Sequence, residues 1–228
     1  MDTANITPQE LAGVIDHTLL KPDATKAQFE QLCREAAENT FAMVAINPYP
    51  VKMCAELLQD TGVKVGAAIG FPLGQTTIED KVAETLVAIG NGAGEIDYVI
   101  NITELKAGNL AYITDEMQRI TDACREHGVT IKVIFENCYL TDDEKRAVAG
   151  VAATVRPDFI KTSTGFGTGG ATLADVRLMR EVVGDAVQIK ASGGVRTLDA
   201  ALEYLAAGVT RIGTSSGLSL LAELRARS

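Results

Sequence analysis

Two lysines stand at the ends of short apolar runs, where a lysine is uncommon. Lys161 follows Ile160 and Lys190 follows Ile189, and small residues and glycine come soon after each. An unpaired buried ammonium group is costly, so such a lysine tends to pair with a carboxylate or to lower its pKa. A lysine with a lowered pKa is a nucleophile for carbonyl carbon. The two lysines therefore predict imine chemistry on a carbonyl substrate.

The two lysines are expected to have unequal roles. Cations that lie close together destabilise each other, and a purely structural pair would need two dedicated carboxylates. We therefore interpret Lys190 as the lysine that keeps its charge and lowers the pKa of Lys161. Moving a lysine pKa from about 10.4 to near 7 takes about 4–5 kcal/mol of differential interaction. A neighbouring charge and burial together can supply that amount.

Positioning these lysines requires strands, and the chain alternates apolar runs with stretches of helical periodicity. The predicted strands are Val14–Leu20, Ala42–Asn47, Lys64–Gly70, Glu95–Asn101, Thr130–Glu136, Phe159–Ser163, Ala186–Ala191 and Thr210–Gly213. The predicted helices are Thr25–Asn39, Val51–Asp60, Ile78–Asn91, Ala111–His127, Asp142–Thr154, Leu173–Val183, Leu198–Ala206 and Leu218–Arg225. Thr77, Thr141 and Thr197 are the expected N-caps of three of these helices.

This alternation predicts an α/β protein in which residues 1–228 form a single (β/α)8 TIM barrel. The strands are short continuous apolar runs, as expected for strands covered on both faces. An open doubly wound sheet is the alternative, but no GxGxxG follows the first strand, which weakens its dinucleotide-binding form. We expect residues 2–13 to form a short helix that plugs the barrel bottom or covers its side.

Active sites of such barrels lie at the carboxyl ends of the strands, and this chain has ionisable residues within those strands. Asp16 and Thr18 belong to the first, Asp97 to the fourth and Lys132 to the fifth, which ends at Glu136. In the fourth strand, alternation places on one face Glu95, Asp97, Val99 and Asn101. In the sixth strand, it likewise places on one face Phe159, Lys161 and Ser163. Asp97 or Lys132 alone could equally be half of a structural ion pair.

Glycine-rich turns follow the last three predicted strands. In barrels, the loops after strands seven and eight and a nearby helix N-terminus form a recurrent phosphate site. Backbone N–H groups and the serine hydroxyls would hold a dianion there without a formal positive charge. A single glycine turn is more often only a tight turn. The predicted phosphate-binding residues are Gly165, Gly193, Gly194, Gly213, Ser215 and Ser216.

Composition narrows the classes of partner and compartment. The formal net charge is −9, which argues against nucleic acid or an anionic membrane surface, because both need a basic footprint. A small anionic substrate remains compatible with that charge. No signal peptide and no run of about 20 apolar residues is visible, so a cytoplasmic location is expected. The four cysteines form no CxxC, so free thiols are expected rather than a zinc site.

The motifs resemble one family along essentially the whole chain. They are Asp16–Pro22, Asn47–Pro48, Gly70–Gly74, Glu95–Asp97, Lys132–Ile134, Phe159–Gly165, Lys190–Arg196 and Gly213–Gly217. In this order they resemble the 2-deoxyribose-5-phosphate aldolases, which are class I aldolases. The resemblance implies that Lys161 is the Schiff-base lysine, Lys190 the second lysine and Asp97 the proton carrier. It also places Lys132, Asp16 and Thr18 in the surrounding proton network.

The resemblance implies reversible cleavage of 2-deoxy-D-ribose 5-phosphate to D-glyceraldehyde 3-phosphate and acetaldehyde. It implies no metal or organic cofactor and a homo-oligomer, either a dimer or a tetramer. Phe166 stands where some relatives have lysine, and Ala45 where many have cysteine. The alternatives are another Schiff-base aldolase of the transaldolase-like type, a metal-dependent aldolase and a non-catalytic phosphosugar sensor. The sensor would need the glycine turns but not both lysines.

Overall fold

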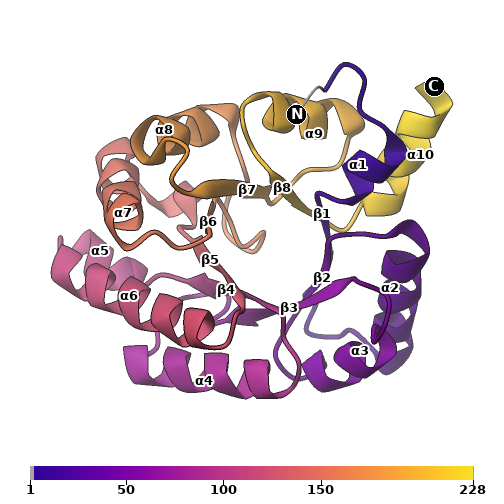
Figure 1. The fold of residues 1–228 in the computed structure, drawn as a ribbon. Coiled ribbons are helices and arrows are strands. Elements are labelled where there is room, and N and C mark those ends of the chain that lie inside the picture. Colours follow the sequence, from indigo (N-terminus) through magenta and orange to yellow (C-terminus); the bar gives the residue numbers. More distant parts are fainter. Residues whose placement is uncertain (1–2, 228) are drawn as a thin grey trace.

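The computed structural model describes residues 3–227 and shows a closed barrel of eight parallel strands, in which each strand pairs with its neighbours in chain order and β8 pairs with β1 (Figure 1). The strands are β1 (Ile15–Leu19), β2 (Met43–Ile46), β3 (Lys64–Ile69), β4 (Glu95–Val99), β5 (Thr130–Ile134), β6 (Phe159–Lys161), β7 (Gln188–Ser192) and β8 (Arg211–Thr214). The predicted fold class is confirmed. Most predicted strands are one or two residues too long at one or both ends.

Helices surround the barrel, as the sequence periodicity predicts (Figure 1). They are α1 (Pro8–Ala12), α2 (Lys26–Asn39), α3 (Val51–Leu57), α4 (Ile78–Gly90), α5 (Ile102–Lys106), α6 (Leu110–Glu126), α7 (Asp142–Val155), α8 (Leu173–Val183), α9 (Leu198–Ala206), α10 (Gly217–Arg227) and the 3-10 turn η1 (Asn137–Tyr139). The three expected caps are confirmed, because Thr77, Thr141 and Thr197 each accept a backbone N–H from the first turn of their helix. The short elements α5 and η1 were not predicted. No helix within residues 3–227 has the length and apolar character needed to cross a membrane.

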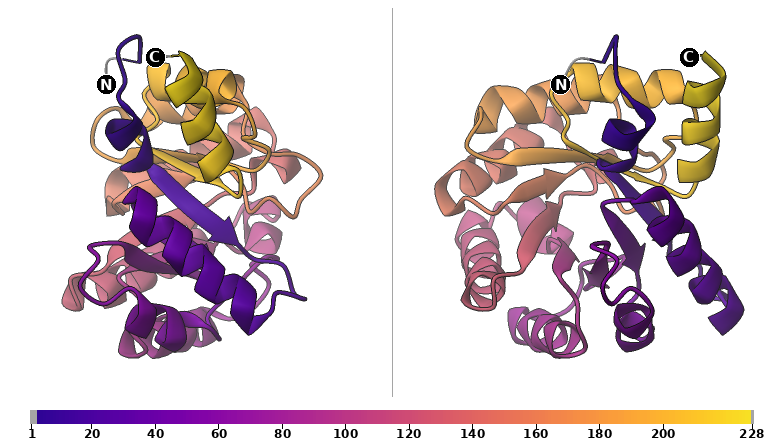
Figure 2. Two further views of the ribbon diagram at one scale, coloured as in Figure 1. Left: turned by 90° about the vertical axis from the view of Figure 1, so that its right-hand side faces the viewer. Right: turned by 45° about the vertical axis from the view of Figure 1, so that its right-hand side comes forward.

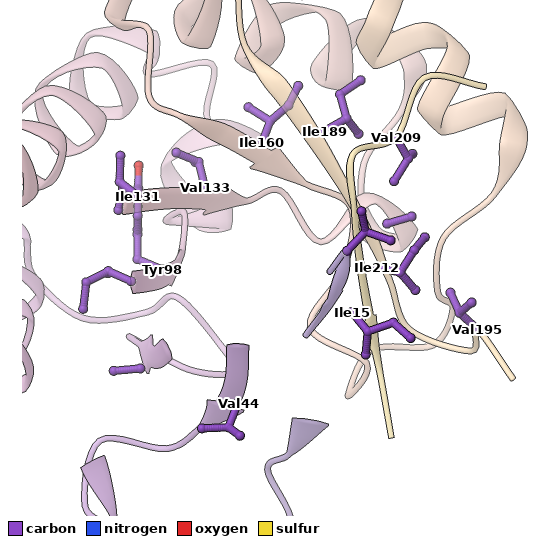
Figure 3. Close-up of a cluster of buried hydrophobic side chains, with 14 of the residues drawn as sticks. Ile15, Val44, Tyr98, Ile131, Val133, Ile160, Ile189, Val195, Val209 and Ile212 are labelled. Carbon is purple, nitrogen blue, oxygen red and sulfur yellow. The ribbon is translucent and has the colours of Figure 1, made fainter. Parts of the chain in front are cut away.

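The apolar core lies between the barrel wall and the helices. Alternate strand residues point outward into this layer, and Figure 3 shows many of their side chains. They include Ile15, Val44, Tyr98, Ile131, Val133, Ile160, Ile189 and Ile212, all fully buried. Because strand side chains alternate between faces, the residues between them point toward the barrel axis. Several of those inward residues are charged, so the outer layer carries most of the hydrophobic stabilisation while the interior is polar.

The N-terminal segment covers the side of the barrel. Helix α1 packs against α10, and Figure 2 shows the two helices side by side. Its first turn is fixed by a capping box in which Thr7 and Glu10 bond to each other's backbone N–H. The segment was expected either to plug the bottom of the barrel or to cover its side, and in the structure it covers the side. Asp2, the first residue of the predicted helix, lies outside the described residues.

Candidate active site

Charged side chains from six strands meet inside the barrel. The cations are Lys132, Lys161, Lys190 and Arg211, and the carboxylates are Asp16, Glu95 and Asp97. Each pair of neighbouring strands in this part of the barrel is held in parallel register, which sets inward residues beside one another. Charged groups this far from water are stable only when they are paired, and each member of the set contacts at least one opposite charge.

Asp97 is the centre of the network. Its Oδ2 accepts hydrogen bonds from Lys161 Nζ at 2.9 Å and from Lys190 Nζ at 2.7 Å, and its Oδ1 accepts one from Lys132 Nζ at 2.8 Å. Burial alone would raise the pKa of Asp97, but the three lysines together hold it well below its ordinary value. Asp97 is therefore a carboxylate that bridges the two lysines singled out in the sequence.

Lys161 is poised to be a neutral amine near physiological pH. Burial lowers the pKa of Lys161 to about 8, Asp97 opposes that change, and Lys190 and Lys132 add to it. A neighbouring charge and burial were expected to act together, and both lower this pKa. Burial is the larger cause, because the side chain of Lys161, the last residue of β6, is only 4% exposed. Lys190 contributes the repulsion that the sequence predicted.

Arg211 was not foreseen from the sequence. Its guanidinium donates to Asp16 Oδ1 at 2.7 Å and to Glu95 Oε2 at 3.1 Å, and it lies 5.4 Å from the ring centroid of Phe159. Glu95 also bonds to Lys132. The signal was present, because Arg211 is a charged residue inside the predicted strand Thr210–Gly213. Its strand is short, so the alternation was less visible there.

Asp16 connects Arg211 to Lys190. Its Oδ2 lies 2.5 Å from Lys190 Nζ, while its Oδ1 accepts from Arg211. Burial would raise the pKa of Asp16, but Lys190, Lys132 and Arg211 lower it below the ordinary value. Thr18, one turn of the pleat further along β1, donates to the main-chain carbonyl of Asp16 at 2.9 Å. Thr18 thus lines the site without bonding to a charged group of the network.

A cavity of about 410 Å³ opens over Lys161 at the carboxyl ends of β1, β6, β7 and β8. Among the residues predicted to bind phosphate, Gly165, Gly193, Gly194, Gly213 and Ser215 line it. Ser216 does not line it, and its N–H donates to Thr214 Oγ1 at 2.9 Å. The glycine turns and the reactive lysine therefore share one cavity, as the strand-end argument requires.

The glycine turn after β7 exists because other side chains would not fit. Gly193 has a φ of +82°, and a Cβ there would lie 2.9 Å from Gly170 Cα. Ala171 N–H donates to the carbonyls of Ser192 at 3.0 Å and Gly193 at 3.2 Å, so the loops after β6 and β7 are tied together. This fixes the part of the cavity wall that Gly193 and Gly194 form.

Two cations line the same cavity, contrary to the expectation of an anion site without formal charge. Lys21, at the end of β1, and Arg196, after β7, are both exposed residues of its wall. Both fall in sequence motifs that were singled out for other reasons. An anion in the cavity would therefore meet backbone N–H groups, Ser215 and two positive side chains.

Glu136 anchors the loop that follows β6. Its carboxylate accepts from Thr164 N at 3.2 Å and from the Thr164 hydroxyl, and Phe166 N–H donates to that hydroxyl oxygen at 3.0 Å. Burial raises the pKa of Glu136. Thr164 and Phe166 also line a second cavity of about 310 Å³ beside the first, where Phe166 packs edge-on against Phe71 at 5.4 Å.

Two residues assigned to these faces lie outside the strands. Val99, the last residue of β4, keeps the alternation of Glu95 and Asp97, but Asn101 lies beyond the strand as the N-cap of α5, where it accepts from Glu104 N at 3.2 Å. Ser163 follows the end of β6, and its main-chain carbonyl accepts from Ser192 Oγ at 2.5 Å. Each strand ends before the alternation does, because the chain turns into a loop or helix. Over residues 3–227, no three histidine, cysteine, aspartate or glutamate side chains are arranged to hold a metal ion.

A closed parallel barrel with a buried lysine of lowered pKa at the floor of a cavity has the parts that Schiff-base chemistry on a carbonyl substrate needs. The chain belongs to the DeoC/LacD family of aldolases, whose sequence model matches residues 11–223.

Relatives agree over nearly the full length. The chain is 54% identical to the deoxyribose-phosphate aldolase of Lactobacillus acidophilus over 221 residues, which are 97% of this chain and 93% of that protein. It is 53% identical to the deoxyribose-phosphate aldolase of Bacteroides thetaiotaomicron over 218 residues, 96% of this chain and 92% of that one. The tetrameric deoxyribose phosphate aldolase of Aeropyrum pernix matches with a TM-score of 0.90 at 30% identity, covering 97% of this chain and 94% of that one.

Proposed function

We propose that this chain is a deoxyribose-phosphate aldolase that cleaves 2-deoxy-D-ribose 5-phosphate reversibly to D-glyceraldehyde 3-phosphate and acetaldehyde. The observation that carries the proposal is Lys161, a buried amine with its pKa lowered to about 8 that opens into a cavity lined by anion-binding groups. Relatives about half identical to this chain bear that activity in their names. We assign deoxyribose phosphate breakdown as its metabolic role.

The proposed reaction begins when neutral Lys161 Nζ attacks the C1 aldehyde and forms a carbinolamine. Loss of water gives a protonated imine, which is the electron sink for the next step. The C3 hydroxyl then loses its proton, and the C2–C3 bond breaks, because only cleavage there leaves a two-carbon fragment on the lysine. D-Glyceraldehyde 3-phosphate leaves, and the remaining enamine is protonated at C2. Hydrolysis of the resulting imine releases acetaldehyde and restores Lys161.

Proton transfer is assigned to Asp97 together with Lys132 and a water molecule. Asp97 lies 2.9 Å from Lys161 and 2.8 Å from Lys132, so it contacts both the reacting nitrogen and a second donor. Its low pKa makes it a weak base, so we propose that it passes protons on rather than storing one. Lys190 adds to the lowering of the Lys161 pKa, with Asp16 holding Lys190 in place. Thr18 forms part of the surrounding wall.

The phosphate of the substrate is assigned to the turns after β6, β7 and β8, with Gly165, Gly193, Gly194, Gly213 and Ser215 facing it. Ser216 would act through the first turn of α10 rather than by direct contact. Arg196 and Lys21 would add charge at the same wall. Holding the phosphate there fixes the distance from the C1 carbon to Lys161 Nζ, which replaces a bimolecular encounter by an oriented one.

Borohydride trapping tests the proposal. The enzyme is incubated with 2-deoxy-D-ribose 5-phosphate and sodium borohydride, and the labelled peptide is identified by mass spectrometry. We expect the reduced adduct on Lys161, and no adduct without substrate. The variant Lys161→Arg keeps the positive charge but cannot form an imine, so turnover and label should both vanish. Label on another lysine, or turnover by that variant, would show that the assignment is wrong.

We also propose that residues 1–228 act as one barrel domain of a homo-oligomeric cytoplasmic enzyme. The tetrameric structure of the Aeropyrum pernix enzyme supports assembly, and a dimer is the alternative. The substrates are small phosphorylated sugars and aldehydes, with no nucleic acid or membrane partner. Light scattering coupled to size-exclusion chromatography measures the assembly, and a monomer at micromolar concentration would contradict it.

A further inference from the structure

The charges inside the barrel do not balance when every group is ionised. Lys132, Lys161, Lys190 and Arg211 are four cations, and among residues 3–227 only the three carboxylates Asp16, Glu95 and Asp97 form ion pairs with them. The set therefore carries a net charge of +1 when Lys161 is protonated, and it becomes neutral when Lys161 loses its proton. An uncompensated charge in a buried site is unfavourable, so the imbalance itself drives Lys161 toward the neutral amine.

Lys161 is the member of the set that can yield the proton most easily. Within the network it contacts a single carboxylate, Asp97, and shares it with Lys132 and Lys190. The other three cations each contact two carboxylates, and the pKa values of Lys132 and Arg211 are raised above their ordinary values, although burial acts to lower both. Lys161 is therefore the group that loses its proton to remove the excess positive charge of the set.

We propose that Arg211 and Glu95, which lie deep in the barrel and do not line the substrate cavity, set the proton occupancy of Lys161 by fixing the net charge of this network. They are positioning residues, because they act through Lys132, Asp16 and the groups those contact. The inference rests on the proposed function, since it assigns a purpose to the neutral state of Lys161.

The surroundings of both groups are accounted for. Lys161 faces Asp97 from β4, Lys132 from β5, Lys190 from β7 and, further off, the carboxyl of Glu136 after β5.

Arg211 faces Asp16 from β1, Glu95 from β4, the Phe159 ring from β6 and Lys190, its register partner on β7. The charge of Arg211 also repels that of Lys132. The outward-facing neighbours of these residues on β4 to β8 carry no charge, and on β1 His17 points outward, where it pairs with Glu35 at 2.7 Å outside the network.

Substitution at the two positions should move the pKa of Lys161 in opposite directions. Arg211→Met removes one cation, so the set with protonated Lys161 becomes neutral and the proton is held more tightly. Glu95→Gln removes one carboxylate, so the same set reaches +2 and the proton is lost more easily. The double variant restores the original imbalance. If Arg211 and Glu95 acted only by shaping the site, the two substitutions would not be expected to shift the pKa of Lys161 in opposite directions.

The test is the pH dependence of kcat/KM and of the rate of borohydride trapping, measured on the full chain from pH 6 to 10. For Arg211→Met we expect the acid limb to move up by about one pH unit, the lower end of the effect of a nearby charge, so that trapping at pH 7 slows about tenfold. For Glu95→Gln we expect a downward shift of similar size. The double variant should return close to the wild-type limb.

Two controls separate charge from other effects. Arg211→Lys keeps the cation, so its acid limb should remain near that of the wild type. Arg146→Met removes an arginine paired with Glu181 on the exposed surface, and should leave the profile unchanged. Thermal unfolding of each variant shows whether it is folded.

Each outcome decides the inference. Shifts of opposite sign support it, while folded single variants with an unmoved limb, or with shifts of the same sign, overturn it. If Arg211→Met does not fold, the near-isosteric Glu95→Gln decides alone, because only a downward shift agrees. Trapping of the wild type on a residue other than Lys161 would instead refute the proposed function, so the two failures are distinct.

Discussion

Replacing Lys190 by methionine should raise the pKa of Lys161 and slow Schiff-base formation most at low pH. Lys161 Nζ and Lys190 Nζ contact the same oxygen of Asp97 at 2.9 and 2.7 Å, so the two nitrogens are at most about 5.6 Å apart. At an effective dielectric constant of about 20, charges at that separation repel by about 3 kcal/mol, or about 2 pKa units.

The magnitude follows from the neutral fraction of Lys161. With a pKa of about 8, about one molecule in ten carries the neutral amine at pH 7. With the pKa raised to about 10, the fraction falls to about one in a thousand. We therefore expect kcat/KM to fall about 100-fold at pH 7 but only about tenfold at pH 9.

The assay is acetaldehyde release at several pH values, with Lys190→Arg as the matched control. Arginine keeps the cation beside Asp97, so its acid limb should stay near the wild-type position. The methionine variant leaves Asp16 paired with Arg211 only, so thermal unfolding must show that it is folded at the assay temperature. A loss of equal size at pH 7 and pH 9 would refute the electrostatic role and point to a direct role of Lys190 in proton transfer.

Three further predictions follow from the geometry. For the wild type, kcat/KM should rise with pH and level off above about 8, because the neutral amine is the reactive form; a limb near 10.5 would contradict the lowered pKa of Lys161. Arg196→Gln should raise KM roughly tenfold for the phosphorylated substrate, the size of one lost charge-assisted hydrogen bond, and leave an unphosphorylated analogue unaffected; an equal effect on both would remove Arg196 from phosphate recognition. Lys81→Met should cost about 3 kcal/mol in urea unfolding, because Lys81 and Glu116 form a fully buried pair at 2.6 Å; Lys81→Met with Glu116→Leu should recover most of that loss, and a single-variant cost below about 1 kcal/mol would contradict the reasoning.

The fold and the centre of the site could be predicted because both rest on local signals. Apolar runs and helical periodicity alternate, and charged residues inside those runs must be compensated. That reasoning selected Asp16, Asp97, Lys132, Lys161 and Lys190, and the structure joins all five in one chain of ion pairs through Asp97 and Lys190. Their catalytic roles remain predictions.

The features that the sequence did not predict depend on which side chains meet in space rather than on patterns along the chain. Alternation assigns a residue to a face but does not tell which opposite charge it meets across a barrel, so the pairing of Arg211 with Asp16 and Glu95 was invisible. The degree of burial at Lys161 could not be read from its neighbours in sequence either. Helix α5, five residues long, is too short to display a periodicity. Arg196 was overlooked as an anion ligand because the glycine turn before it already accounts for its motif, and Lys21 because its motif was singled out for Asp16 and Thr18.

The interior network has a consequence for how the enzyme gains activity as it folds. Asp16 and Arg211, which bond to each other, are 195 positions apart, and β1 and β8 complete the ring of strands. A chain that has built only β5 to β8 and their helices has hydrophobic contacts, but its lysines lack the carboxylates Asp16, Glu95 and Asp97, which all come from β1 and β4. In such an intermediate Lys161 is solvated and its amine is mostly protonated at neutral pH, so imine formation is slow. Recovery of aldolase activity during refolding would therefore report closure of the barrel, and it would lag behind the recovery of helical circular dichroism.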